Sequence, residues 1–263
     1  MKMSPVRKIV QYIVMVFVVV FVVLFSWYLF NRFSFSKEIP FYSVKSAENI
    51  GLTIGVIGDS WVAGKKLDSL LHNAFLDRGI ESKIISSGRP GAKSKFIYQN
   101  LFKETSEEYS SRFIIESNPD YCIVIAGVND AAAQMGSRYY SNHMIEIVKT
   151  LLHYNIKPVI VSLPEVGVVE FLSTKDIYRR GWNIISAYVN NRGEIDNVRD
   201  YRKAFQEALE SAKLTNRILM IDFDNVCKDY NKCEGLYKDP LHLSLKGNKE
   251  LARVLCDELL NVN

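Results

Sequence analysis

An uncharged run near the amino terminus restricts how this chain can fold more than any other feature of the sequence. From Ile9 to Phe30 the chain has 22 residues without a charge, interrupted only by Gln11 and Ser26. As a helix this run is roughly 33 Å long, enough to cross a bilayer. Its length and all-round apolarity disfavour a buried core helix, and no small-x-small cleavage site follows it. The sequence therefore predicts an uncleaved transmembrane anchor over residues 9–30, through which the chain contacts the membrane.

The charges that flank the run predict its orientation. Three cations precede it, and the two that follow closely are partly offset by an acid (Lys2, Arg7 and Lys8; Arg32, Lys37 and Glu38). Because positive residues stay on the cytoplasmic side, we expect residues 1–8 to form a cytoplasmic tail and the body to lie outside. In a bacterium the outside is the periplasm or the cell surface. Residues 31–50 then form a tether to a single domain over residues 51–263.

The composition of the body argues against several functional classes. The formal net charge is +4, but without the three cations before the run 30 Lys and Arg face 29 Asp and Glu, which leaves +1. This balance gives no reason to expect a nucleic-acid partner. The four cysteines form no Cys-x-x-Cys pair, and we expect neither a metal nor a cofactor. Cys122 and Cys256 lie in apolar segments and are expected to be buried thiols, whereas Cys227 and Cys233 either bridge in an oxidising compartment or stay free.

Apolar runs alternate with helical patterns through the body. The predicted strands are Thr53–Gly58, Lys83–Ser86, Tyr121–Ala126, Lys157–Ser162 and Arg217–Asp222, and the predicted helices are Leu67–Arg78, Ser94–Glu107, Ser141–Tyr154, Val198–Lys213 and Lys246–Leu260. Strands that alternate with helices form a parallel sheet covered on both faces. The predicted fold class is therefore α/β, a three-layer α/β/α sandwich with a central parallel sheet. Residues 165–197 break this rhythm, and their length predicts a lid-like insertion.

Polar residues follow three of the predicted strands, and a fourth polar segment lies near the carboxyl terminus. The segments are Gly58-Asp59-Ser60, the turn Ser87–Ser94, Gly127-Val128-Asn129-Asp130 and Asp239-Pro240-Leu241-His242. Taken singly, each has an ordinary explanation as a helix cap, a turn or a coincidence. The first three, however, lie at the carboxyl ends of parallel strands, where ligands and catalytic groups gather.

In this order the four segments resemble the SGNH (GDSL-type) hydrolase family, and the resemblance extends over nearly the whole body. It implies a flavodoxin-like fold and a serine esterase in which Ser60 is the nucleophile. His242 is then its general base and later its general acid, and Asp239 orients the imidazole. The oxyanion hole implied by the resemblance consists of the backbone N–H groups of Ser60 and Gly91 and the side-chain amide of Asn129.

The resemblance leaves one alternative open and departs from the family name at one position. Gly88 is an alternative to Gly91 as the second oxyanion donor, because both glycines lie in the same turn. Trp61 stands where the family name has a leucine, and we expect it to affect the rim of the site rather than the proton chemistry.

The resemblance and the predicted anchor together indicate a class of substrate. An acyl-enzyme on serine is released by water or by a sugar hydroxyl, so hydrolysis and acyl transfer are both open. The leading hypothesis is an esterase or O-acyltransferase for O-acetyl groups on cell-envelope carbohydrate, because an anchored domain stays near envelope glycans. One alternative is a lipid-directed esterase, a lysophospholipase or thioesterase, favoured by apolar residues of the insertion (Val166, Val168, Val169, Phe171 and Leu172). Another is a non-catalytic glycan-binding or scaffold protein, against which the complete set of site residues argues. Protein partners and oligomeric state are not indicated.

Overall fold

The computed structural model describes residues 5–44, 51–233 and 235–261, and it divides the chain into two compact units. The first unit ends at Phe35 and consists mainly of the helix α1 (Pro5–Phe33). Within α1 the segment Ile9–Phe33 is long and apolar enough to cross a membrane. The predicted anchor over 9–30 therefore lies in a helix that continues three residues further. Of the predicted tail over residues 1–8, residues 1–4 lie outside the described residues and residues 5–8 belong to α1.

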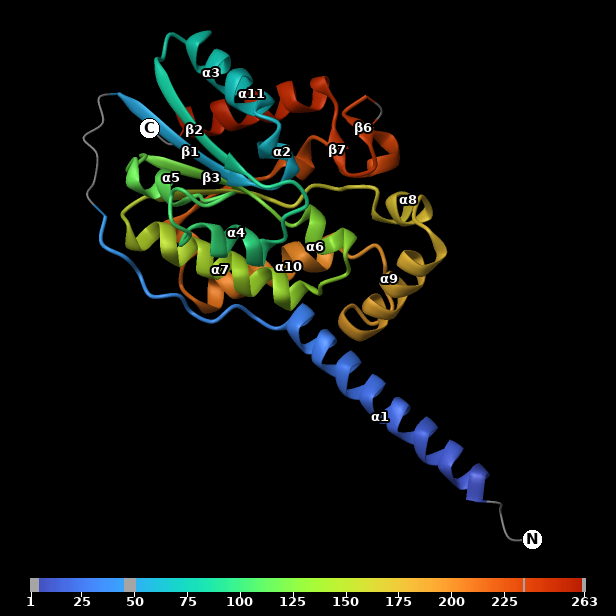
Figure 1. Ribbon diagram of the computed structural model, residues 1–263. Helices are drawn as coiled ribbons and strands as arrows, with labels where there is room; N and C mark the ends of the chain where they lie inside the picture. Colours follow the sequence, from blue (N-terminus) through green and yellow to red (C-terminus); the bar gives the residue numbers. More distant parts are fainter. Residues whose placement is uncertain (1–4, 45–50, 234, 262–263) are drawn as a thin grey trace. The chain divides into compact units, whose positions relative to one another are not determined.

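The second unit contains a five-stranded parallel sheet (Figure 1). Its strands are β1 (Leu52–Gly58), β2 (Ser82–Gly88), β3 (Tyr121–Ile125), β4 (Lys157–Val161) and β5 (Leu219–Ile221), in the order β2-β1-β3-β4-β5. All four pairings are parallel. The three central strands are buried along nearly their whole length, as expected for a sheet covered on both faces. This arrangement confirms the predicted fold class.

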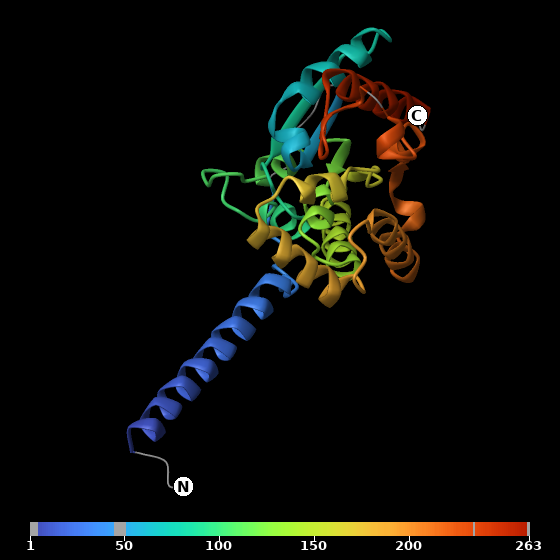
Figure 2. The same ribbon diagram turned by 90° about the vertical axis from the view of Figure 1, so that its right-hand side faces the viewer.

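Helices cover both faces of the sheet (Figures 1 and 2). One face carries α3 (Lys66–Leu76) and α11 (Leu245–Asn261), and the other carries α4 (Ser94–Asn100), α7 (Ser137–His153) and α10 (Val198–Ser211). In α7 the buried residues Tyr140, Met144, Ile147 and Leu151 recur every three or four positions, which gives the helix one apolar face for the core. Three shorter helices lie next to the strands in the sequence. The helix α2 (Ser60–Ala63) follows β1, α5 (Arg112–Glu116) precedes β3, and α6 (Val128–Ala132) follows β3.

Residues 36–44 pack on the body instead of hanging free. The backbone N–H of Ile39 donates to the Tyr98 hydroxyl at 3.2 Å, and that of Tyr42 donates to the Tyr154 hydroxyl at 3.0 Å. Of the tether predicted over residues 31–50, residues 36–44 therefore belong to the compact unit, which begins at Ser36. The remainder of that prediction, residues 45–50, lies outside the described residues.

The stretch 165–197 is mostly helical, with α8 (Val168–Ser173) and α9 (Ile177–Asn190). Val166, Val168 and Leu172 are buried in the core, so three of the apolar residues assigned to acyl-chain binding are used in packing. Beyond β5, three 3₁₀ turns (Thr215–Arg217, Phe223–Asn225 and Tyr230–Lys232) and a hairpin of β6 (Tyr237–Asp239) and β7 (His242–Leu243) complete the unit. Cys227 and Cys233 form a disulfide, whereas Cys122 and Cys256 are free and buried, as expected for them.

Gly88 offers a test of how closely β2 packs on the turn after β1. A Cβ atom at Gly88 would lie 2.2 Å from the backbone nitrogen of Ala63, whereas a Cβ at Gly64 would meet nothing within 4 Å. We expect Gly88→Ala to lower the free energy of unfolding by about 1–3 kcal/mol, because backbone at this distance has to shift. The Tm in detergent, followed by circular dichroism, should fall by about 2–12 °C. Gly64→Ala is the matched control, and equal Tm values for the two variants would contradict the expectation.

Candidate active site

Ser60 is the first residue of α2, and Asp59 separates it from the end of β1 at Gly58. Asp59 caps this short helix, because its Oδ1 accepts the backbone N–H of Trp61 at 3.0 Å. Asp59 is completely buried. Burial, with a smaller contribution from the nearby charge of Asp130, raises the pKa of its carboxyl to about 7 against the hydrogen bonds that lower it. The strand end thus holds Ser60 on a cap with a carboxyl group that is partly protonated near neutral pH.

Asn129 comes to the same carboxyl group from the end of β3. The helix α6 begins after Gly127, whose φ of +114° lies in a region that L side chains rarely adopt. The Asn129 amide nitrogen donates to Asp59 Oδ2 at 3.1 Å. A side-chain amide has two N–H groups, and within the described residues Asn129 makes no second side-chain hydrogen bond. One N–H therefore stays available for a ligand beside Ser60.

The glycine turn after β2 distinguishes the two candidate oxyanion donors. Gly88 is paired with Gly58 in the sheet and is wedged against the Ala63 backbone. In the turn, the Ala92 N–H donates to the Arg89 carbonyl at 3.1 Å, and Gly91 has a φ of +70°, as in a type II turn. Within the described part of the chain, the Gly91 N–H makes no backbone hydrogen bond. The geometry therefore favours Gly91 over Gly88 as a donor.

Asp130 joins the second and third segments. Its carboxylate accepts the Ser94 backbone N–H at 2.9 Å and the Ser94 hydroxyl at 2.7 Å. Asp130 is completely buried, and this burial raises the pKa of its carboxyl to about 6. Apart from their places in the segments, nothing in the sequence indicates a function for Asp59 or Asp130, because aspartate is also an ordinary residue at the start of a helix.

His242 lies on the hairpin near the carboxyl terminus, with Asp239 on its Nδ1. The Nδ1 atom is 2.8 Å from Asp239 Oδ1 and 3.0 Å from Oδ2. The backbone N–H groups of Leu241 and His242 also donate to Oδ1, both at 3.0 Å. Although partial burial raises the pKa of Asp239, these hydrogen bonds outweigh it and hold the pKa below its usual range. An ionised carboxylate only accepts, so Nδ1 carries the proton and Nε2 of a neutral His242 is free to accept one.

Trp61 connects the first segment to the fourth, which corrects the expectation that it lies at the rim. Its ring is buried, and the indole N–H donates to the Leu241 carbonyl at 2.8 Å, one residue before His242. The ring also packs edge-on against Phe223 at a centroid distance of 6.4 Å. Replacing leucine by tryptophan therefore adds a hydrogen bond that fixes the histidine loop relative to the serine turn.

Ser60 and His242 line one cavity of about 230 Å³, together with Trp61 (the other lining residues are Gly64, Lys66, Lys238, Leu243, Ser244, Leu245 and Asn248). Among the described residues the lining includes two lysines and no acid. Among the described residues Ser60 and His242 make no direct hydrogen bond, and such pairs often tighten only when substrate binds. Gly91 and Asn129 do not line this cavity. They are connected to it through Gly58, whose carbonyl accepts the Arg89 N–H at 3.1 Å, and through Asp59.

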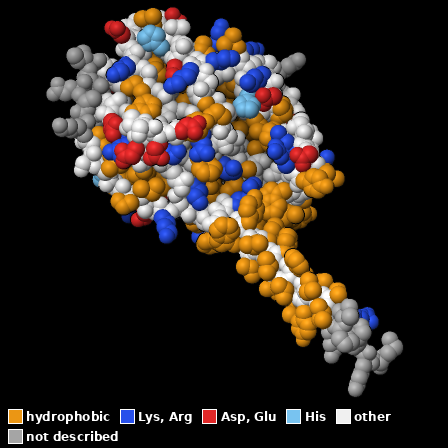
Figure 3. Space-filling view, viewed as in Figure 1, with side chains coloured by type: hydrophobic (Ala, Val, Ile, Leu, Met, Phe, Trp, Pro, Cys, Tyr) orange, Lys and Arg blue, Asp and Glu red, His pale blue; other side chains and the backbone are white. Residues whose placement is uncertain are grey.

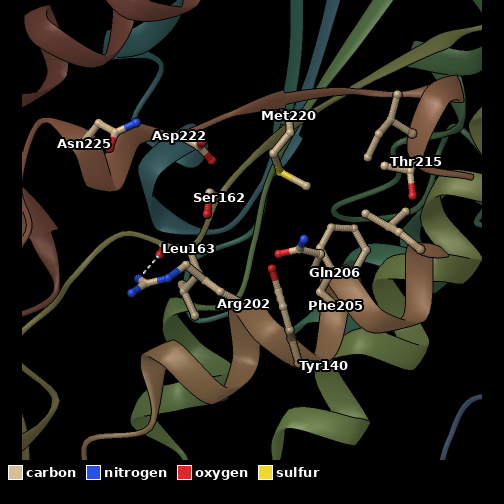
Figure 4. A pocket seen from close by; sticks show the side chains of 12 residues that line it. Tyr140, Ser162, Leu163, Arg202, Phe205, Gln206, Thr215, Met220, Asp222 and Asn225 are labelled. Carbon is tan, nitrogen blue, oxygen red and sulfur yellow. Dashed lines mark hydrogen bonds between the residues drawn. The ribbon is translucent and has the colours of Figure 1, made fainter. Parts of the chain in front are cut away.

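A second and larger cavity, of about 420 Å³, lies between α10 and the β4–β5 edge of the sheet (Figure 4). Ser162 and Asp222 border it at the carboxyl ends of β4 and β5, and Arg202 borders it from α10. The Arg202 guanidinium is engaged by the Leu163 carbonyl at 2.8 Å and by the Glu165 carboxylate. None of the residues predicted for catalysis lies here, so size alone does not identify the site. No group of three metal-ligating side chains occurs among the described residues.

Comparison with known proteins identifies the family. Residues 56–250 match the profile of the GDSL-like lipase/acylhydrolase family, and the chain therefore belongs to this family of ester hydrolases. No curated protein sequence matches the chain.

Solved structures share the fold at low sequence identity. A lipase/acylhydrolase from Enterococcus faecalis has a TM-score of 0.58 and 19% identity, over 80% of this chain and 96% of that one. The acetyl xylan esterase AlAXEase has a TM-score of 0.56 and 17% identity, over 80% and 99% of the two chains. The psychrotrophic esterase EstA from Pseudoalteromonas sp. has a TM-score of 0.52 and 17% identity, over 80% and 94%. These similarities agree with the parallel sheet and its helix layers.

Trp61→Phe tests whether the indole hydrogen bond positions the histidine loop. The phenyl ring keeps much of the packing but cannot donate to the Leu241 carbonyl. We expect kcat for a short-chain nitrophenyl ester to fall about fivefold with little change in KM, because a neutral hydrogen bond contributes about 1 kcal/mol. Trp182→Phe, which removes an indole on α9, is the control. An unchanged kcat in Trp61→Phe, or an equal loss in the control, would argue against the positioning role.

Proposed function

We propose that the protein is a serine esterase in which Ser60, His242 and Asp239 form the catalytic triad. The observation that carries this proposal is that Ser60 and His242 line one cavity while Asp239 holds the Nδ1 side of the imidazole. Ser60 Oγ attacks the ester carbonyl carbon as His242 Nε2 takes its proton. The tetrahedral intermediate then collapses, and the protonated imidazole returns the proton to the leaving alcohol. Water, activated by His242, releases the acyl group from Ser60 and completes hydrolysis.

The proposed oxyanion hole consists of the backbone N–H groups of Ser60 and Gly91 and the amide of Asn129. Two features support it. The Gly91 N–H is free of backbone acceptors in the described residues, and Asn129 has one N–H on Asp59 and one to spare. Such donors stabilise the negative oxygen of the intermediate more than the neutral carbonyl, and each typically contributes about 100-fold or more in rate.

The size of the cavity favours a short acyl group. Its volume of about 230 Å³ is below the roughly 300–1,000 Å³ of sites that enclose drug-sized ligands. An acetyl group needs little room, whereas a long acyl chain needs an extended apolar channel. Of the five residues that supported a lipid substrate, Val166, Val168 and Leu172 are buried in packing, whereas Phe171 is half-buried and Val169 exposed. We therefore propose O-acetyl esters as substrates rather than lysophospholipids or long-chain thioesters.

The proposed acceptor of the acetyl group is a cell-envelope carbohydrate. An anchored domain meets envelope glycans continuously, and the structural neighbours include a protein named as an acetyl xylan esterase. Lys66 and Lys238 are exposed and line the cavity, and no acid is among its lining residues in the described part of the chain; this charge suits a glycan that carries carboxylates. Acyl transfer to a sugar hydroxyl follows the same steps with the sugar in place of water.

We also propose that the helix α1 stays in the membrane and that the body lies on its outer side. The cations before the helix favour a cytoplasmic amino terminus. The disulfide between Cys227 and Cys233 adds an independent argument, because disulfides persist in oxidising compartments and are rare in the cytosol. The body would then be periplasmic or at the cell surface in a bacterium.

Covalent labelling tests the nucleophile directly. The full-length protein in detergent is treated with a fluorophosphonate probe, and acetate release is measured on an acetylated, carboxylate-bearing polysaccharide. We expect Ser60→Ala to lose labelling and at least about 1,000-fold of the acetate release, because no other group replaces the serine oxygen. Ser211→Ala is the matched control, since Ser211 is an exposed serine on α10.

Two outcomes would overturn the proposal. Labelling of Ser60→Ala at the wild-type rate would exclude Ser60 as the nucleophile, whatever the fold. A kcat/KM that rises from acetyl to palmitoyl nitrophenyl esters would instead favour the lipid-directed alternative and contradict the argument from cavity volume.

Topology is tested by carboxyl-terminal fusions in a bacterial host. Because the charge bias and the disulfide both favour an exported body, we expect an alkaline phosphatase fusion to be active and a fluorescent-protein fusion to be dark. An inactive phosphatase fusion together with a fluorescent partner fusion would reverse the orientation. An intact amino-terminal tag on the membrane-bound protein would show that the helix is retained, and loss of the tag would show that it is cleaved.

A further inference from the structure

The helix α9 has its apolar side facing solvent, the reverse of an ordinary surface helix. Its two fully buried residues are the small Ser186 and Ala187. Large apolar residues instead occupy positions that recur every three or four residues and are exposed (Ile177, Tyr178, Ile184, Ile185, Tyr188 and Val189). A surface helix of a soluble domain normally buries its apolar stripe against the core. Here the stripe has no place in the core, so its pattern is explained only by a partner outside the body.

The exposure of this apolar face is extensive. Tyr178 is 86% exposed, Ile177 79%, Tyr188 72% and Val189 63%. In Figure 3, hydrophobic side chains gather on the lower right of the body, over the region that α9 occupies in Figure 1. Contiguous apolar patches of this kind on a folded domain mark contact with a protein, a ligand or a membrane.

Basic residues also occur on and around α9. Residues 175–192 contain four cations and one acid, a net charge of +3 (Lys175, Arg179, Arg180 and Arg192; Asp176). Asp176 caps the helix and pairs with Arg179 at 3.5 Å. Arg179 and Arg180 are exposed and lie seven positions before the buried Ser186 and Ala187, so they stand on the side of the helix away from its apolar face. An apolar face on a helix that also carries cations is the pattern of helices that lie in the surface of an anionic bilayer.

The course of the chain limits how far α9 can lie from the end of the candidate span. The body begins at Ser36, three positions after the candidate span ends at Phe33, a reach of at most about 10 Å. The Ser36 N–H donates to His143 on α7 at 3.0 Å. The end of α9 is tied to the residues just before α7, because the Asn190 and Asn191 amides donate to Gln134 at 3.1 and 2.8 Å. The start of the body and the end of α9 are therefore both held at the amino-terminal half of α7.

We propose that the apolar face of α9 lies in the surface of the bilayer that holds α1. The inference rests on the proposed retention of α1 in the membrane and is independent of the esterase chemistry. Ser186 and Ala187 hold the helix on the body, while Ile177, Ile185 and Tyr188 enter the boundary between headgroups and acyl chains. This second contact restricts rotation of the body about its single anchor.

Lipid-attached quenchers test the contact in the full-length protein. The chain is reconstituted at one copy per nanodisc with anionic phospholipid, and an environment-sensitive fluorophore is placed at Ile185→Cys. The free native thiols are buried and the other two cysteines are bridged, so the new thiol reacts selectively. We expect a quencher in the upper acyl chain to reduce the fluorescence at least about twofold. Glu207→Cys on the exposed, polar side of α10 is the matched control and should not respond.

A label at Val20→Cys in α1 separates failure of this inference from failure of the anchor. Quenching at position 20 without quenching at position 185 would overturn the α9 contact and leave the anchor intact. Absence of quenching at both positions would remove the anchor and the inference together. If position 185 were shielded only in discs that hold two copies, the face would be an interface between chains, and the proposed lipid contact would be wrong.

Discussion

Two buried carboxyl groups at the carboxyl edge of the sheet hold the candidate active site together. Asp59 accepts hydrogen bonds from the Trp61 backbone and the Asn129 amide, and Asp130 accepts two from Ser94. These contacts join the loops after β1, β2 and β3, which the parallel sheet only brings near one another. Burial raises the pKa of both carboxyl groups, because a buried charge is costly. Dense hydrogen bonding offsets part of this cost and fixes the loops before substrate arrives, which is the condition for electrostatic preorganisation.

The fourth loop depends on a different interaction, since no carboxyl group of the sheet edge reaches it. The Trp61 indole bridges from the serine turn to the Leu241 carbonyl, and Asp239 organises the same loop from within through His242 and two backbone N–H groups. Ser60 and His242 are therefore coupled through one buried side chain next to Ser60. A leucine at position 61 would fill space here without directing the loop, which explains why tryptophan is compatible with the fold.

The fold was predictable from the sequence because strands buried on both faces give short apolar runs, and the starts of β3 and β4 agree with those predicted. The four site segments were also visible, since polar residues at strand ends contrast with such runs. The hydrogen bonds between these segments were not predictable, because nothing near Trp61 in the sequence indicates a bond to Leu241. The stretch 165–197 was predicted as a lid-like insertion because charge and aromatics obscure its two helices. Val168 is buried and Ile177 is exposed because of the side that each helix turns toward the body. The hydropathy of the sequence does not reveal which side that is.

This ambiguity about sides has a physical meaning in a chain that carries a candidate membrane span. In water alone, an exposed face with Tyr178, Ile185 and Tyr188 is unfavourable, and burial of that face would be expected. The side toward the body holds the buried Ser186 and Ala187 and the half-buried Trp182, which rotation of the helix would expose instead. The structure keeps these residues inward, where the Asn190 and Asn191 amides fasten the end of the helix to Gln134. If α1 stays in a membrane, as proposed, the bilayer is a second apolar phase in which contact with the exposed face of α9 becomes favourable.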